Sequence, residues 1–261
     1  MRKNVAWITG ASSGIGEEIC KQLAAKNYTL VLSSRNKEKL EQLKNSLPNK
    51  ENHLVVPLDL ENTQTIAQTV DDVFSKTPFI SHVFHCGGIS QRALAHETSI
   101  EIDRKLMEIN YFGTVALTKA ILPYFQRQKE GHFVVVSSIA GKFGFYLRSA
   151  YSASKHALHG FFESLSLEEA HHNICVTIVC PGKINTPISL SALDKNGKAH
   201  GVMDHNQATG MPVKTCVQQL LKAVDQKKRE VLIGNKEIKA VTLKRFLPTL
   251  FWKIISKQSP I

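Results

Sequence analysis

The chain has 261 residues, 43% of them hydrophobic and 21% charged, and its formal net charge is +11. This composition is ordinary for a soluble globular protein, and the length fits one large α/β domain or two small ones. No window approaches the ~18 consecutive apolar residues that a membrane-spanning helix needs. The five cysteines form no C-x-x-C pair, which indicates free thiols in a reducing compartment. Because the first apolar run leaves no space for a signal peptide, we expect a cytoplasmic protein.

Most of the positive charge lies in the last fifth of the chain. Residues 214–261 contain eleven Lys or Arg against three acids, a net charge of +8. Such a segment can meet nucleic acid, anionic lipid or phosphorylated ligands. No signature of a nucleic-acid-binding module accompanies it, so we expect no nucleic-acid partner.

The first apolar run, residues 5–9, predicts a buried strand, and a glycine-bearing turn and a helical pattern follow it. In this context glycines let the backbone approach a pyrophosphate, whose charge rests on the helix N-terminus. The spacing Gly-x-x-x-Gly-x-Gly differs from the G-x-G-x-x-G fingerprint, and a turn that binds nothing is the alternative. The predicted cofactor-binding residues of this turn are Gly10, Ser12, Ser13, Gly14, Ile15 and Gly16.

A second strand, residues 28–33, ends in a turn beside which an adenosine ribose is expected to lie. Enzymes that prefer NAD place a carboxylate here. No acid occurs between Tyr28 and Lys37, whereas Arg35 does. An arginine can bind a 2′-phosphate with two N–H groups. The turn therefore favours NADP(H), and a solvated arginine that opens the next helix is the alternative.

Two further strands are predicted at residues 53–57 and 80–85. Asp59, followed by Leu60, comes directly after the first of them and could accept from an adenine amino group or cap the next helix. Gly87 and Gly88 follow the second, where small residues leave space for a ribose against the backbone. All four residues are assigned to cofactor binding.

A helical stretch, residues 99–128, carries Asn110 in its middle. Asparagine is a poor residue for a helix interior. Asn110 is therefore either solvated, or it distorts the helix and offers its carbonyl group to a water.

Three further strands, at residues 132–138, 174–180 and 230–233, complete the predicted strands of the chain. Strands that alternate with helices predict one Rossmann-type, doubly wound parallel sheet of about seven strands with helices on both faces. The ligand is then expected at the carboxyl ends of the strands. Several polar or small residues fall just past strand ends, namely Gly10, Asp59, Gly87, Ser138 and Pro181.

Tyr151 and Lys155 are four residues apart, which places them one turn apart on the same helix face. The ammonium group favours the phenolate, so we expect a lowered pKa for Tyr151. Ser138, at a strand end, could hold a carbonyl or alcohol oxygen against that phenol. Proton transfer to this oxygen is half of a carbonyl reduction, and the hydride requires a nicotinamide. A solvated Tyr–Lys pair is the common alternative.

A polar segment, residues 183–212, follows the sixth strand and is long enough to be a binding element. Its glycines suggest mobility, and we expect it to close over the substrate. Phe143, Phe145 and Tyr146 could supply an apolar wall near Ser138, which favours a hydrophobic substrate. These aromatic residues could instead only pack their own loop.

The ordered motifs resemble those of the short-chain dehydrogenase/reductase superfamily over nearly the whole chain. They are TGASSGIG (9–16), Asp59, Asn110, Ser138, YSASK (151–155) and PGKINT (181–186). Three further segments resemble the dehydrogenase/reductase member 7-like branch most closely, namely ISQRALAHET (89–98), EINYFGTVALTK (108–119) and LKRFLP (243–248).

The resemblance implies an NADP(H)-dependent oxidoreductase that interconverts a carbonyl compound and an alcohol, with Asn110, Ser138, Tyr151 and Lys155 as catalytic residues. Tyr151 would act as general acid or base, and Asn110 would position a water that relays protons to Lys155. Both residues, with Lys155, would also belong to the cofactor site. After the sixth strand, the backbone of Ile184 and the hydroxyl of Thr186 would hold the nicotinamide carboxamide, and Pro181 and Gly182 would also belong to the cofactor site. A non-catalytic NADP(H) sensor that presents a surface to a partner is the alternative function.

One departure from the superfamily pattern is visible after the fourth strand. The usual Asn-Asn-Ala-Gly is replaced by His85-Cys86-Gly87-Gly88. The missing asparagines normally tie the central sheet together, which puts the local hydrogen bonding in doubt.

Residues 1–234 are predicted to form the catalytic domain, and residues 235–261 a basic extension packed on it. The stretch 241–257 mixes apolar and basic residues, so it could lie on a membrane surface, over the substrate cleft or against a sister subunit. Phe161 and Phe162 are consecutive on the helix that relatives commonly pair between subunits, so we expect a homodimer or homotetramer.

Overall fold

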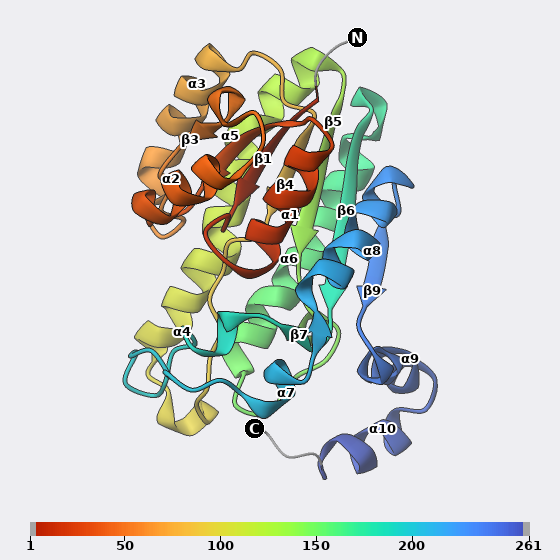
Figure 1. Ribbon diagram of the computed structural model, residues 1–261. Coiled ribbons are helices and arrows are strands. Elements are labelled where there is room, and N and C mark those ends of the chain that lie inside the picture. Colours follow the sequence, from red (N-terminus) through yellow and green to blue (C-terminus); the bar gives the residue numbers. More distant parts are fainter. Residues whose placement is uncertain (1–3, 258–261) are drawn as a thin grey trace.

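Seven strands form one parallel sheet in the order β3-β2-β1-β4-β5-β6-β9 (Figure 1). The computed structural model describes residues 4–257. The strands are β1 (Val5–Thr9), β2 (Thr29–Ser33), β3 (Leu54–Val55), β4 (His82–His85), β5 (Gly131–Val136), β6 (Ile174–Pro181) and β9 (Glu230–Ile233). A separate parallel pair consists of β7 (Ile184–Asn185) and β8 (Met211–Pro212). The predicted doubly wound parallel sheet of about seven strands is confirmed.

Helices cover both faces of the sheet, which explains why the central strands are almost uniformly apolar. One face packs against α1 (Gly14–Ala25), α2 (Lys37–Ser46) and α8 (Val213–Asp225). The other packs against α3 (Ile66–Lys76), α4 (Ile100–Met107), α5 (Gly113–Gln128) and α6 (Ser149–Glu168). Within residues 4–257, no helix has the length and apolar character needed to cross a membrane.

Single-turn helices connect these elements. They are η1 (Lys50–Asn52), η2 (Thr63–Thr65), η3 (Ala95–Glu97), η5 (Ile139–Gly141), η6 (Ala170–His172), η7 (Pro187–Ser189) and η8 (Lys236–Ile238). The predicted strand at residues 53–57 shrinks to two residues in β3, which lies at the sheet edge and has only β2 as a neighbour. Because an edge strand has one partner, its length is the least constrained by pairing.

The predicted helix over residues 99–128 is interrupted in its middle. Between α4 and α5 lies a single π-helical turn, η4 (Glu108–Phe112), with Asn110 at its centre. Asn110 is fully buried, so of the two alternatives the solvated side chain is excluded, and the helix is distorted at this residue. Such turns inside α-helices frequently mark functional sites.

The segment 183–212 and the C-terminal segment lie together below the carboxyl edge of the sheet (Figure 1). The first contains α7 (His205–Ala208), and the second contains α9 (Lys239–Phe246) and α10 (Pro248–Ile255). Phe251 of α10 is buried and packs edge-on against Phe143, with ring centroids 5.0 Å apart. The inner side of this segment therefore packs on the body of the protein. The predicted catalytic domain (1–234) includes residues 1–3, and the predicted extension (235–261) includes residues 258–261. Both of these ends lie outside the described residues.

Two buried histidines, His85 and His132, and the partly buried His82 are expected to make the fold sensitive to acid. Burial lowers the pKa of His82 to about 4 and the pKa of His85 and of His132 to about 3. In the unfolded chain these groups titrate near ~6.5, so protonation below that pH favours unfolding. We expect the free energy of unfolding to be highest above about pH 6.5 and to fall as the pH decreases toward about 4.

Urea unfolding at pH values on both sides of this window measures the effect. A His132→Gln variant, which cannot titrate at that position, should lose less stability over the same interval. Equal stability of the wild type across the window would contradict the assignment of neutral buried imidazoles.

Candidate active site

A cleft of about 780 Å³ opens at the carboxyl edge of the sheet. It brings together nearly all the residues that the sequence assigned to catalysis or cofactor binding, although they come from distant parts of the chain. The predicted residues that line it are Gly10, Ser12, Ser13, Gly14, Ile15, Gly16, Arg35, Asp59, Leu60, Gly87, Gly88, Ser138, Tyr151, Lys155, Pro181, Gly182, Ile184 and Thr186. Asn110 does not line the cleft.

The turn between β1 and α1 has a backbone that only glycine accommodates easily. Gly10 and Gly14 have φ angles of +64° and +57°, in the left-handed region. A Cβ atom on Gly16 would lie 2.4 Å from the Gly10 carbonyl oxygen, and one on Gly10 would lie 2.8 Å from the Gly87 amide nitrogen. The turn is therefore tight and lies directly against the end of β4. Across the cleft, Gly14 faces Thr186, whose Cβ would be 3.4 Å from an added Cβ.

The end of β4 is held by Thr9 in place of the missing asparagines. The Thr9 Oγ1 atom accepts hydrogen bonds from the amides of Cys86 and Gly87, both at 3.1 Å. His85 points its Nε2 atom at the Thr118 hydroxyl, 3.0 Å away. The local hydrogen bonding that the sequence put in doubt is thus supplied by a side chain of the neighbouring strand.

Arg35 and Asp59, which follow β2 and β3 in the chain, both line the cleft. Arg35 is exposed, and Lys39 on the first turn of α2 lines the same cleft. Asp59 accepts a hydrogen bond from the Glu61 amide at 3.0 Å. Its carboxylate therefore closes a local turn rather than capping a helix that starts at Asn62.

Tyr151 and Lys155 lie one turn apart at the start of α6, and both line the cleft. The Lys155 Nζ atom lies 5.9 Å from the centroid of the Tyr151 ring. The same atom donates a hydrogen bond to the Val136 carbonyl oxygen at 2.9 Å. Lys155 is thus anchored to the end of β5, and burial lowers its pKa to about 8.

The expected lowering of the Tyr151 pKa by Lys155 is wrong in this structure. Burial of the phenol raises the pKa of Tyr151 and is the largest influence on it. A hydrogen bond with Ser138 and the guanidinium groups of Arg148 and Arg92 act in the opposite direction. The physical reason is that burial disfavours the phenolate more than the neighbouring cations favour it. At neutral pH the phenol therefore carries its proton.

Asn110 lies immediately behind the cleft wall and ties three segments together. Its Oδ1 atom accepts from the Ile89 amide at 2.8 Å, and its Nδ2 atom donates to the Ile89 carbonyl oxygen at 2.9 Å. Nδ2 also donates to the Ser154 hydroxyl at 3.0 Å, and that hydroxyl donates to the Tyr151 carbonyl oxygen. Asn110 thereby connects the π-helical turn to the helix that carries Tyr151. Ser154 lies within the YSASK motif, but its part in this connection could not be read from the motif.

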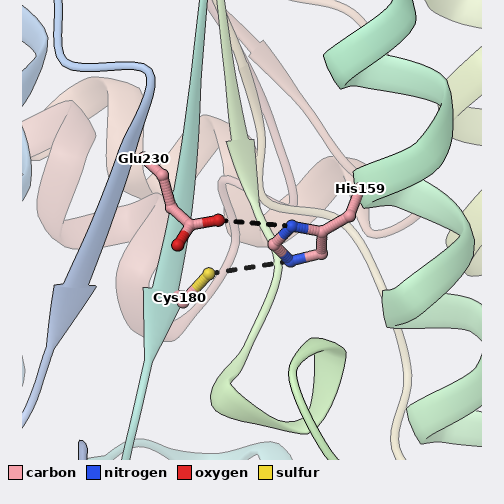
Figure 2. A group of neighbouring side chains, drawn as sticks. All are labelled: His159, Cys180 and Glu230. Carbon is pink, nitrogen blue, oxygen red and sulfur yellow. Dashed lines mark hydrogen bonds and ion pairs between the residues drawn. The ribbon is translucent and has the colours of Figure 1, made fainter. Parts of the chain in front are cut away.

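One turn beyond Lys155 on α6, His159 connects the helix to three neighbouring elements (Figure 2). Its Nε2 atom lies 3.1 Å from the Ser137 hydroxyl and 3.7 Å from the Cys180 sulfur. Its Nδ1 atom lies 3.5 Å from a Glu230 carboxylate oxygen. Burial lowers the pKa of His159 to about 4, so the imidazole is neutral. We infer that this contact fixes α6 against the sheet directly behind Lys155.

His159, Cys180 and Glu230 are residue types that can bind a cation. The protonation of Cys180 and the positive charge beside Glu230 favour a structural role. Burial raises the pKa of Cys180 to about 12, so its thiol stays protonated. Lys142 forms an ion pair with Glu230 and compensates that carboxylate. The protonated thiol is therefore a poor nucleophile.

A buried ion pair that the sequence did not reveal anchors the segment 183–212 beside Tyr151. Arg92 donates through Nε to an Asp204 carboxylate oxygen at 2.8 Å, and Arg148 donates to the same oxygen at 3.1 Å. The side chains of Arg92 and Asp204 are 2% and 1% exposed. A bridge between Gln91 and Leu193 adds a second attachment. The segment is thus tied down at two points, despite the glycines that suggested mobility.

The apolar wall differs in one residue from the prediction. Phe145 and Tyr146 line the cleft, whereas Phe143 is buried behind it and stacks on Phe145 with ring centroids 4.7 Å apart. Ile255 of α10 also lines the cleft. Phe143 therefore serves as packing between the cleft wall and the C-terminal helices.

The sequence of this chain is similar to those of known proteins. The family model for short chain dehydrogenase matches residues 4–197. The Mus musculus protein "Dehydrogenase/reductase SDR family member 7B" is 39% identical over 265 residues, which cover 99% of this chain and 82% of the mouse protein.

Solved structures have the same fold. A short-chain dehydrogenase from Streptomyces avermitilis is 26% identical and superposes with a TM-score of 0.84 over 98% of both chains. A Burkholderia phymatum structure in complex with NAD has 19% identity and a TM-score of 0.84, covering 99% of this chain and 96% of the other. A Burkholderia cenocepacia structure in complex with NADP has 23% identity and a TM-score of 0.81, covering 98% of this chain and 99% of the other.

Proposed function

Because the chain belongs to the short-chain dehydrogenase family, we propose that it is an NADP(H)-dependent oxidoreductase that interconverts a ketone or aldehyde and the corresponding alcohol. The observation that carries this proposal is the convergence of Ser138, Tyr151 and Lys155 in the cleft that also contains the glycine turn. Proton-transfer groups and a phosphate-binding turn in one cleft are what carbonyl reduction with a nicotinamide requires.

The residues present fit a dinucleotide. The turn at Gly10, Gly14 and Gly16 brings backbone rather than side chains to the N-terminus of α1, where a pyrophosphate would bind. Lys155 would hold the nicotinamide ribose, and Ile184 and Thr186 would hold the carboxamide. When bound, the dinucleotide supplies the hydride that no side chain can donate.

The chain's own residues perform the proton transfer. Ser138 positions the substrate oxygen, and Tyr151 donates its phenolic proton to that oxygen or accepts one from the alcohol in the reverse direction. The raised pKa of Tyr151 keeps the phenol protonated at neutral pH, as a proton donor to a carbonyl oxygen must be. Lys155 and Asn110 keep the phenol and its helix in position.

The cofactor preference is proposed from charge at the adenosine end of the cleft. Arg35 and Lys39 both line the cleft, and β2 ends at Ser33 without an acid in the turn that follows. A 2′-phosphate would be attracted by both cations, whereas the family as a whole includes proteins solved with either dinucleotide. The proposal therefore depends on these two side chains and not on family membership.

An Arg35→Asp exchange is expected to weaken NADPH binding by about 10–100-fold and to leave NADH binding unchanged or stronger. A charge-assisted hydrogen bond of this kind contributes roughly 1.5–3 kcal/mol. Fluorescence titration of both dinucleotides measures the two dissociation constants. Arg127→Asp, an exposed position on α5 outside the cleft, is the matched control. A parallel loss of NADH and NADPH affinity would refute the role of Arg35.

The substrate is proposed to be a hydrophobic carbonyl compound. Apolar side chains from residues 139–146, residues 188–193 and α10 line the cleft, and they favour apolar ligand surface. They are Ile139, Phe145, Tyr146, Ile188, Leu190, Leu193 and Ile255. Consumption of NADPH with a panel of ketones and aldehydes of increasing chain length tests this; rates that do not rise with apolar surface would oppose it.

A homodimer or homotetramer remains a proposal. The argument from adjacent aromatic residues is weaker than expected, because Phe162 is buried and Phe161 is only partly exposed beside Tyr111. Leu167 on the same helix, 68% exposed, is the better indication of a contact. Sedimentation of the purified chain decides the oligomeric state.

A further inference from the structure

The two C-terminal helices expose an unusual amount of apolar surface. We use the name docking patch for five large side chains of α9, α10 and their connection. These are Phe246 (71% exposed), Leu247 (54%), Leu250 (44%), Trp252 (54%) and Ile254 (43%). Twelve large hydrophobic side chains are exposed in the described part of the chain, so nearly half of them lie within nine consecutive residues. Such a concentration marks an interaction surface.

The docking patch is carried by an element that is firmly attached to the body. The opposite side of α10 contributes Phe251, which is buried against Phe143, and Ile255, which lines the cleft. Lys244 of α9 donates a hydrogen bond to the Lys142 carbonyl oxygen at 3.0 Å. The exposed side chains are therefore not the loose end of an unfolded tail, because the inner face of the same helices is packed.

The surroundings of the patch are basic. Between residues 238 and 257 the chain has no Asp or Glu, and its cations are Lys239, Lys244, Arg245, Lys253 and Lys257. Apolar side chains interleaved with Lys and Arg, including an aromatic residue with a polar N–H group, are the composition of helices that lie in the interface of an anionic bilayer.

We propose that α9 and α10 dock the protein on the surface of an anionic membrane. The apolar side chains enter the headgroup region and the cations contact lipid phosphates or carboxylates. Two other occupants fit less well. A second copy paired about a two-fold axis would bring identical basic patches together, and no acid within 238–257 could compensate them. A nucleic acid would match the cations but not the exposed Leu and Ile side chains.

The position of the patch connects it with the cleft. The exposed side chains Tyr146 and Leu190 both line the cleft, and α10 and the segment 183–212 lie at the same end of the molecule (Figure 1). A docked protein would therefore hold the cleft close to the bilayer surface. The docking itself does not depend on the proposed oxidoreductase activity, and its test needs no substrate.

The chain contains a natural fluorescence reporter for this docking. It has two tryptophans: Trp7 is fully buried in β1 with its indole N–H bonded to Ser33, whereas Trp252 lies in the patch. Vesicles of phosphatidylcholine with and without phosphatidylserine are added to the full chain. We expect the full chain to float with the anionic vesicles, with a blue shift of the emission that arises from Trp252, and both effects to weaken with salt.

Three variants locate the effect. Arg245→Gln/Lys253→Gln is expected to weaken binding about 30-fold, since each of the two cations near an anionic surface contributes about a five-fold factor. Leu250→Ser/Ile254→Ser should abolish flotation, while Leu167→Ser, at a still more exposed position on α6, should float as the wild type does. Wild-type protein that stays in the soluble fraction, or whose Trp252 emission does not change, would overturn the proposal. So would a dimer that Leu250→Ser/Ile254→Ser dissociates while no vesicle binding occurs.

Discussion

Replacing Tyr151 by Phe is expected to lower the rate of carbonyl reduction by about 10²–10⁴-fold, the range contributed by a positioned general acid. The exchange removes one oxygen and keeps the aromatic ring, which is almost completely buried and packs in the core. The affinity for NADPH should change far less than the rate, because the glycine turn and Lys155 are unaffected. Single-turnover kinetics and a separate NADPH titration distinguish the two quantities.

A matched control removes a different phenolic oxygen. Tyr124 on α5 donates a hydrogen bond to Asp71 at 2.6 Å, outside the cleft. Tyr124→Phe should reduce carbonyl compounds at the wild-type rate. If Tyr151→Phe and wild type consumed NADPH equally fast with every carbonyl compound, the assigned proton donor would be refuted, although the fold would stand.

Replacing Asp204 by Ala is expected to have the second largest effect, on both stability and substrate binding. Asp204 is 1% exposed on its side chain and compensates Arg92, which is 2% exposed. Removal of one partner leaves a buried charge unpaired and costs about 3–5 kcal/mol. Because Asp204 belongs to the segment 183–212, we expect that segment to detach and the KM for the carbonyl substrate to rise more than kcat falls.

Limited proteolysis and urea unfolding measure this loss. Asp194→Ala is the control, since Asp194 lies in the same segment but is used only in a surface turn, where it accepts from the amides of Asn196 and Lys198. Asp194→Ala should unfold at nearly the same urea concentration as the wild type and should have nearly the same KM. An Asp204→Ala chain that unfolds at the same urea concentration as the wild type would show that the ion pair does not hold the segment.

Much of the architecture could be predicted because it is determined by local pattern. The apolar runs that became β1 and β9 match the predicted strands residue for residue. Gly10 and Ser138 follow strand ends as predicted, Pro181 is the last residue of β6, and all three line one cleft. The resemblance to the short-chain dehydrogenase family and its member 7-like branch is confirmed by the matching relatives.

The rest depends on contacts between residues far apart in the chain. Arg92 and Asp204 are 112 residues apart, and no spacing rule pairs them. The direction of the Tyr151 pKa shift was wrong because helical spacing indicates which side chains are neighbours but not how deeply they are buried. The hydrogen bond from Lys155 to the Val136 carbonyl oxygen could likewise not be predicted from the YSASK motif.

The role of the C-terminal segment also could not be predicted from the sequence pattern alone. Its mixture of apolar and basic residues left three interpretations open, namely membrane, cleft and sister subunit. The structure places Phe251 and Ile255 inward and Trp252 outward, so one segment both completes the cleft and presents a surface. An amphipathic pattern broken by Pro248 could not separate these two roles, since each helix is only about two turns long.

The most direct test of the account follows the hydrogen itself. The protein is incubated with NADPH deuterated at the nicotinamide C4 position and with a panel of hydrophobic ketones, and the alcohols are analysed by mass spectrometry. The account predicts one deuterium on the carbinol carbon with the wild type and with Tyr124→Phe, and almost none with Tyr151→Phe. If NADPH binds but no ketone in the panel gains deuterium, the oxidoreductase proposal is contradicted and the chain is an NADP(H) sensor.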